Sequence, residues 1–267
     1  MKHDLRRYRT ALITGASSGI GEAFAEALAR QGLDLILVAR SQERLEEIAV
    51  RLALAHDRRV EVISADLAKP QPGAALLKKV RALDMDVDLL INNAGFGIAG
   101  GNFHENDPAR QQQMLALNVG AVMDLTHTFL PAMVERKTGA IINVASLAGF
   151  QPTPYLTVYG ATKAFVLALS EGLWAEYRSK GIAVLAVCPG PVDTAFFEAT
   201  GDPGMRDLIP PGTMLTAPQV VSASLKALAQ GKSFVVPGAI MKAASLLPRL
   251  LPRGAVARVS ARTMKQR

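Results

Sequence analysis

A tyrosine and a lysine that could act together in proton transfer stand four residues apart, as Tyr159 and Lys163. On a helix this spacing puts both side chains on one face, about one turn apart. A tyrosine phenol has a reference pKa of about 10, so alone it seldom exchanges protons at neutral pH. A neighbouring ammonium favours the phenolate, and we expect it to lower that pKa toward the working range. The spacing alone is also typical of two surface residues, so the catalytic interpretation depends on the rest of the chain.

A glycine-rich turn near the start of the chain could bind a phosphate group. It runs from Gly15 to Gly21, between a predicted strand over 10–14 and a predicted helix that reaches about Gln31. Glycines let the backbone approach a pyrophosphate, and a helix N-terminus offers free N–H groups and a positive dipole end. Position in this turn makes the following residues candidate cofactor contacts: Gly15, Ser17, Ser18, Gly19, Ile20 and Gly21.

Two further strand ends carry polar residues suited to a nucleotide. Arg40 follows the second predicted strand, where an acid would otherwise bind a ribose 2′-hydroxyl, and its guanidinium suits a 2′-phosphate. Asp66, with Leu67 beside it, follows the third strand and could accept a hydrogen bond from an adenine amino group. The alternatives are a solvated arginine and a loop aspartate that bonds its own backbone.

These positions require a sheet that brings strand ends together, and the pattern of the chain predicts one. Apolar runs alternate with helical segments, which is typical of a doubly wound parallel α/β sheet of the Rossmann type with helices on both faces. We predict strands over 10–14, 34–39, 60–65, 87–92, 140–144, 182–187 and 233–236. The helices after the first are predicted over 41–55, 72–83, 108–136 and 157–180, with another starting near Pro218.

Composition limits the class of protein. The 267 residues fit one domain over 1–237 with an extension over 238–267. The single cysteine, Cys188, excludes an internal disulfide framework and is typical of a reducing cytosol. We therefore expect a cytoplasmic protein, with no signal peptide at the start and no membrane-spanning stretch.

Six motifs in order show a resemblance to a known family. The chain resembles the short-chain dehydrogenase/reductase family over roughly residues 8–237, with Ser146 thirteen residues before Tyr159 as in that family. The matching residues are TGASSGIG (14–21), NNAG (92–95), Asn118, Ser146, the Tyr159/Lys163 pair and PGPVDT (189–194).

The resemblance implies catalytic roles. Ser146 would hydrogen-bond the substrate carbonyl oxygen, and Tyr159 would donate the proton in reduction or accept it in oxidation. Lys163 would lower the tyrosine pKa and bind the nicotinamide ribose, and Asn118 would hold a water of the proton relay. Alternatively, Ser146 merely ends a strand and Asn118 caps a kink in a helix. Ser146 and Tyr159 would also be the substrate contacts.

The resemblance also implies a nicotinamide cofactor, and Arg40 indicates NADP rather than NAD. Residues 16–18 lack the basic residue that some NADP-using members carry, so the preference rests on Arg40 alone. Further implied cofactor contacts are Asn93, Ala94, Gly95, Tyr159, Lys163, Pro189, Val192 and Thr194. Thr194 could instead simply begin a loop, and Asn92 is expected to tie neighbouring strands together.

The substrate side is less specific. The segment 191–215 is predicted to be a mobile lid over a small apolar carbonyl or alcohol, with possible hinges at two glycines. Its apolar residues are Phe196, Phe197, Met205, Leu208 and Ile209, and Phe96, Phe150 and Pro154 could line the same pocket. The alternative is a loop that packs on its own core.

Residues 238–267 combine apolar side chains with bases, and no acid occurs from Leu208 onward. Such a segment can lie on an anionic membrane, bind an acidic partner or cover a subunit interface, or it can be an ordinary docked helix. Nucleic acid is not expected, because the segment lacks interleaved aromatics and the chain lacks a DNA-reading motif.

The sequence therefore predicts an NADP-dependent oxidoreductase that interconverts a carbonyl and an alcohol, with no metal. Alternatives are a non-catalytic cofactor-binding sensor or scaffold, which would not need the Ser–Tyr–Lys set, and other nicotinamide chemistry such as epimerisation. The resemblance also implies a homo-oligomer formed through the predicted helices 108–136 and 157–180.

Overall fold

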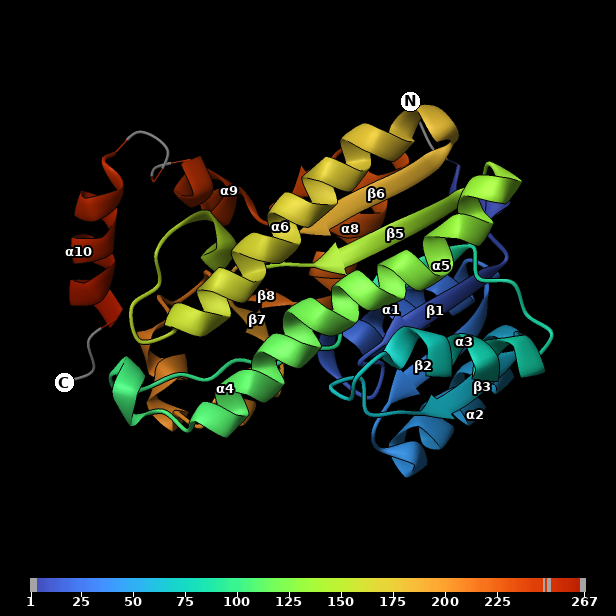
Figure 1. Cartoon of the computed structure of the whole chain (residues 1–267), viewed down its shortest axis with the longest axis horizontal. Helices are drawn as coiled ribbons and strands as arrows, with labels where there is room; N and C mark the ends of the chain where they lie inside the picture. The colour runs from blue at the N-terminus through green and yellow to red at the C-terminus, as the bar shows by residue number, and fades with distance from the viewer. Residues whose placement is uncertain (1–3, 247, 249–250, 265–267) are drawn as a thin grey trace.

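A computed structural model describes residues 4–246, 248 and 251–264. This part of the chain folds around a sheet of seven parallel strands in the order β3-β2-β1-β4-β5-β6-β9, which confirms the predicted fold class (Figure 1). The strands are β1 (Thr10–Thr14), β2 (Asp34–Ala39), β3 (Val60–Ser64), β4 (Leu89–Asn92), β5 (Gly139–Val144), β6 (Ile182–Val187) and β9 (Phe234–Val235). Each lies within two residues of its predicted bounds.

The strands form because both of their faces are buried. In β1, Ala11 and Ile13 belong to one hydrophobic core, and Leu12 between them belongs to the other. Strands buried on both faces read as continuous apolar runs, which is why the sequence showed them clearly. Helices supply the other half of each core.

Two helical layers enclose the sheet (Figure 1). One core is completed by α1 (Gly19–Arg30), α2 (Gln42–His56) and α8 (Ala217–Ala229). On the opposite face lie α3 (Pro72–Ala82), α5 (Val122–Arg136) and α6 (Thr157–Tyr177). Apolar packing on both sides holds the carboxyl ends of the strands at one edge, where ligands bind in open α/β sheets.

The predicted helix over 108–136 is not one regular helix. Asp107 caps α4 (Pro108–Leu115) by accepting a hydrogen bond from the Ala109 N–H, as expected for Asp before Pro. A π-helical stretch, Ala116–Ala121, then separates α4 from α5. Such stretches widen a helix locally and are frequent at functional sites, and this one contains Asn118.

The region 191–215 contains short regular elements, where a loop was predicted. Strands β7 (Val192–Asp193) and β8 (Leu215–Thr216) pair in parallel at its two ends. Between them lie α7 (Phe196–Ala199) and a 3₁₀ helix (Pro203–Leu208). Because the two ends are hydrogen-bonded to each other, the segment leaves the β7–β8 pair and returns to it.

The extension contains α9 (Ala239–Leu246) and α10 (Arg253–Met264). Helix α10 lies at the edge of the molecule, beside the loop that precedes α6 (Figure 1). Among the described residues, no helix is both long and apolar enough to cross a membrane.

Candidate active site

The glycine turn has the tight geometry that close approach to a ligand requires. Gly15 and Gly19 have φ of +64° and +58°, in the left-handed region that favours glycine. A Cβ on Gly21 would lie 2.2 Å from the Gly15 carbonyl oxygen, so no side chain fits there. Ser18 stands at the N-cap of α1 without a side-chain capping bond, which leaves the first-turn N–H groups open to a ligand. The turn therefore fits a phosphate-bearing cofactor.

The NNAG segment connects this turn to the rest of the site. The Asn93 side chain donates to the carbonyl oxygens of Thr14 (3.0 Å) and Gly15 (3.1 Å). The Thr14 hydroxyl in turn accepts the backbone N–H groups of Asn93 (2.9 Å) and Ala94 (3.0 Å). Asn93, expected on the cofactor floor, thus also fixes the glycine turn. Thr14 takes part in this network although the sequence analysis assigned it no role.

Asn92, the neighbouring residue, is structural, as predicted. Its amide donates to the Asn143 side chain on β5 (2.9 Å) and to the Thr126 hydroxyl on α5 (3.2 Å). The bond ties adjacent strands β4 and β5 together beneath the site.

Arg40 lies at the carboxyl end of β2 and is exposed. Within the described ranges, no acidic side chain pairs with its guanidinium; only its backbone carbonyl is engaged, by the Ser64 hydroxyl (3.0 Å). Asp66 accepts a hydrogen bond from the Ala68 N–H (3.0 Å), the self-bonded loop geometry that was the alternative for this residue. One of its oxygens thus holds the turn in which Leu67 is buried.

Ser146, Tyr159 and Lys163 come together at the ends of β5 and α6. The Lys163 ammonium is 6% exposed, donates to the Val144 carbonyl (2.8 Å) and lies 5.7 Å from the centre of the Tyr159 ring. Ser146 accepts the Ala148 N–H (3.1 Å) and shares a hydrogen bond with the Tyr159 phenol. The pair is therefore not a solvated surface pair, which was the alternative interpretation.

The ionisation of this pair differs from the expectation. Burial raises the pKa of Tyr159 to about 12, and the hydrogen bond with Ser146 opposes that rise only in part. Burial also lowers the pKa of Lys163 to about 8. The prediction that Lys163 brings the phenol pKa toward neutrality was wrong for the protein alone, because desolvation disfavours both charged forms. At neutral pH the phenol keeps its proton.

Asn118 lies in the π-helical stretch and is 1% exposed. Its side chain accepts the Phe96 N–H (3.1 Å) and donates to the Phe96 carbonyl (2.9 Å) and the Thr162 hydroxyl (3.2 Å). A Cβ on Gly95 would lie 2.9 Å from the Asn118 amide oxygen and 3.5 Å from the Lys163 ammonium. Asn118 thus holds the NNAG loop against α6, close to Lys163.

The PGPVDT segment closes the site from the far end of the sheet. Thr194 accepts the Phe196 N–H (3.4 Å), and its methyl group would lie 3.0 Å from a Cβ on Gly19. Val192 is buried in β7, and the Met241 side chain of α9 packs where a Cβ on Gly190 would lie. The glycine turn and the Pro189–Thr194 segment therefore face each other, as a dinucleotide site shared between them requires.

The sequence profile of the family described as short chain dehydrogenase matches residues 9–203. The chain belongs to the short-chain dehydrogenase/reductase family. It is 39% identical over 187 residues to the very-long-chain 3-oxoacyl-CoA reductase-B of Danio rerio, a match that covers 69% of this chain and spans only 60% of that relative. Two solved structures cover more. A Sphingobium yanoikuyae short-chain dehydrogenase in complex with NADPH is 36% identical, with a TM-score of 0.80 over 97% of this chain and 96% of its own. The bulky-bulky ketone specific alcohol dehydrogenase of Comamonas testosteroni is 32% identical, with a TM-score of 0.77 over 97% and 95%.

In this short-chain dehydrogenase, two phenylalanine rings from the 191–215 segment lie next to Tyr159 or to each other. The Phe196 ring packs on the Tyr159 ring, with centroids 5.4 Å apart, and on Phe197 at 5.9 Å. Phe150, expected in the same pocket, packs on Phe234 of β9 at 5.8 Å. The predicted lid residue Leu208 lies in the 3₁₀ helix, and its side chain is outside the described part of the structure.

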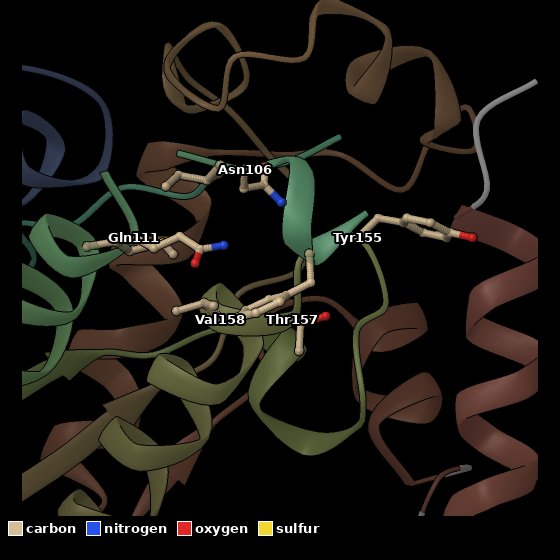
Figure 2. A pocket seen from close by; sticks show the side chains of 8 residues that line it. Asn106, Gln111, Tyr155, Thr157 and Val158 are labelled. Atoms are coloured by element: carbon tan, nitrogen blue, oxygen red, sulfur yellow. The ribbon is translucent and has the colours of Figure 1, made fainter. Parts of the chain in front are cut away.

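A small pocket lies next to the catalytic helix (Figure 2). Asn106 and Gln111 border it on one side and Thr157 and Val158, just before Tyr159, on the other, while Tyr155 extends toward α10. The complete lining is Ile98, Phe103, Asn106, Gln111, Met114, Tyr155, Thr157 and Val158. The sequence analysis named none of these residues, because they are contributed by two loops and two helices without a shared motif.

The extension carries exposed apolar side chains among its bases. Ile240 is 62% exposed and Val259 is 58% exposed, while Val256 on α10 is buried. Several predicted tail residues lie outside the described residues: Leu247, Arg249, Leu250, Lys265 and Arg267.

Proposed function

We propose that this chain is an NADP(H)-dependent oxidoreductase that interconverts a ketone or aldehyde with the corresponding alcohol. The observation that carries the proposal is the cluster of buried Lys163 with half-buried Ser146 and Tyr159, joined to the glycine turn through the NNAG segment. A sensor that only binds the cofactor would have no use for a protonated phenol hydrogen-bonded to a serine. The cluster therefore favours catalysis over that alternative.

The residues present fit a nicotinamide dinucleotide. The turn from Gly15 to Gly21 would hold the pyrophosphate on open N–H groups of α1, with Ser17, Ser18 and Ile20 beside it. Asn93, Ala94 and Gly95 would lie under the adjacent ribose, and Pro189, Val192 and Thr194 would bind the nicotinamide end. The cofactor, when bound, supplies or accepts the hydride, and the protein orients it and handles the proton.

NADP preference rests on Arg40. Its exposed guanidinium has no acidic partner among the described residues and stands where the second strand ends, so it is free to pair with a 2′-phosphate. The NADPH bound to the similar Sphingobium enzyme supports the same preference. Asp66 would accept a hydrogen bond from the adenine amino group with the carboxylate oxygen that is not bonded to the Ala68 N–H.

The catalytic roles follow from the geometry. Ser146 would donate a hydrogen bond to the carbonyl oxygen, and Tyr159 would transfer its proton to that oxygen as hydride arrives. With a pKa of about 12 the phenol is protonated at neutral pH, which is the form that reduction requires of the proton donor. Lys163 would bind the ribose hydroxyls and stabilise the negative charge that develops on the phenol oxygen.

Asn118 supports a more limited role than the one expected. Both N–H donors of its side-chain amide are engaged, by the Phe96 carbonyl and the Thr162 hydroxyl, so it has no N–H left to donate to a water. A water of the proton relay would instead use a backbone carbonyl of the π-helical stretch, where the regular hydrogen-bond pattern is interrupted. Asn118 would then be a positioning residue.

The substrate is proposed to be an apolar carbonyl compound. Phe196 presents an apolar ring beside Tyr159, and Ile98, Met114 and Val158 add apolar side chains to the mixed lining of the pocket in Figure 2. The named activities of the relatives, on 3-oxoacyl-CoA and on bulky ketones, point to the same class. A homo-oligomer is also proposed, through α5 and α6, which expose Met123 (52%) and Phe165 (38%).

The extension supports a separate proposal, contact with an anionic membrane surface. Exposed Ile240 and Val259 lie in a segment with Lys242, Arg258 and Arg262 and without any acid. An acidic protein partner is the competing occupant.

The catalytic proposal is tested by NADPH oxidation with a panel of ketones, aldehydes and β-ketoacyl thioesters. Tyr159→Phe is expected to lower turnover by roughly 10²–10⁴-fold, the usual contribution of general acid catalysis. NADPH affinity should be unchanged, since the phenol hydroxyl is not needed to hold the dinucleotide. Turnover that survives the substitution would refute the role of Tyr159.

A further inference from the structure

The segment that carries Phe196 is fastened to the loop after the NNAG motif. The Ala99 N–H donates to the Thr200 carbonyl (3.2 Å), and Thr200 is 1% exposed. Close to this bond, a Cβ on Gly100 would lie 3.6 Å from the Asp202 side chain. Arg206 adds ion pairs to Asp193 and to Glu198 within the segment. The segment is therefore held in place across the mouth of the site.

This attachment directs two adjacent phenylalanines to different tasks. Phe197 is 6% exposed and packs into the protein, while Phe196 is half-buried and lies against the catalytic ring. The Tyr159 and Phe196 rings are inclined by 50°. Phe196 thus borders the space beside the phenol, and Phe197 anchors the helix that presents it.

Gly97 completes the contact. A Cβ at this position would lie 2.8 Å from the Phe196 ring and 3.4 Å from the Tyr159 ring. The first distance is shorter than side chains tolerate, so the Phe196 ring occupies space that exists only because residue 97 is glycine. Ile98 and Val158, the neighbours of Gly97 and Tyr159, line the pocket of Figure 2.

We propose that Phe196 is the specificity-determining residue of this site and that it limits the size of one substituent of the ketone. The inference rests on the proposed function. A carbonyl group bound to Ser146 and Tyr159 has two substituents, and the one that passes beside the phenol meets the Phe196 ring. The larger apolar substituent then lies on the side of Ile98 and Val158. The substrate class is ketones with one small and one large apolar substituent.

The test compares the reduction by NADPH of phenyl methyl ketone and phenyl butyl ketone by wild type and Phe196→Ala. Wild type should favour the methyl ketone in kcat/KM, and Phe196→Ala should shift the ratio toward the butyl ketone by roughly tenfold or more. A single extra methylene in an apolar pocket typically alters discrimination by roughly 10–200-fold, and the two ketones differ by three. Equal use of both ketones by wild type, or an unchanged ratio in the variant, would overturn the proposal.

A matched control separates the effect of the Phe196 ring from that of Phe197, which anchors the same segment. Phe197→Leu loosens the same segment without removing the ring beside Tyr159, so it should leave the ratio near that of wild type. If Phe197→Leu shifts the ratio as far as Phe196→Ala does, mobility of the segment and not the Phe196 ring sets specificity. NADPH affinity and thermal stability, measured for each variant, identify any that is misfolded, and Phe196→Leu then replaces Phe196→Ala.

The contact with Gly97 adds a double-mutant cycle. Gly97→Ala should lower kcat/KM for the methyl ketone in wild type, but should have little effect in the Phe196→Ala background, where the clashing ring is absent. Additive effects would contradict the pairing, because residues that do not interact give independent changes. If none of the carbonyl compounds tested supports NADPH oxidation by wild type, both the proposed function and this inference fail. If it reduces ketones without regard to size, only this inference fails.

Discussion

Replacing Lys163 with methionine should change how the stability of the protein depends on pH. The ammonium is 6% exposed, and burial lowers its pKa from an ordinary value of 10.5 to about 8. By linkage, a shift of this size corresponds to about 3 kcal/mol of differential stability. Between pH 8 and 10.5 the unfolded chain binds the proton and the folded chain does not. Wild type should therefore gain stability as pH rises through that window.

Lys163→Met has no such group, so its free energy of unfolding should lack this gain. The difference between wild type and variant should move by about 3 kcal/mol in favour of wild type from pH 7.5 to 10.5. Other titrating groups, including the Tyr159 phenol, are present in both proteins and contribute similarly to each. Urea unfolding of the protein without cofactor, measured at several pH values, gives this difference directly.

The exposed Lys78 on α3 provides the control. Lys78→Met should follow wild type at every pH, because this side chain is already in solvent in the folded chain. If the difference between wild type and Lys163→Met is constant over this range, Lys163 is not desolvated and the described ionisation of the site is incorrect.

Two further predictions test the cofactor and the extension. Arg40→Asp should weaken NADPH binding by roughly 10–100-fold, which is the contribution of a charge-assisted hydrogen bond, and should leave NADH binding nearly unchanged. Fluorescence titrations measure both affinities. An equal loss of both would refute the assignment of Arg40 to the 2′-phosphate. Wild type should co-sediment with phosphatidylserine-containing vesicles at low salt and be released from them at high salt. The double variant Arg258→Glu/Arg262→Glu should bind these vesicles at least tenfold more weakly, because each base contributes about 1 kcal/mol at an anionic surface. Absence of wild-type binding at low salt would end the membrane proposal.

The sequence alone was sufficient for the architecture. Strands such as β2 and β6 are buried on both faces, so each appears as an uninterrupted apolar run bounded by polar or glycine residues. The conformational demands of Gly15 and Gly19 are equally local, because a positive φ favours glycine through the backbone of that residue itself. The spacing of Tyr159 and Lys163 on one helical face is a property of the helix itself.

Properties that depend on contacts between distant segments were decided only by the tertiary structure. The pKa of Tyr159 was predicted to fall but is raised, because the neighbouring Lys163 can be read from the sequence whereas the desolvation that dominates the tyrosine pKa comes from the surrounding fold. The packing of Phe196 on Tyr159 through the space left by Gly97 joins three segments with no common motif. Local sequence patterns indicate the backbone conformation and which positions alternate between buried and exposed. The desolvation of a side chain and its contacts with distant segments arise only when the sheet has brought its strand ends together.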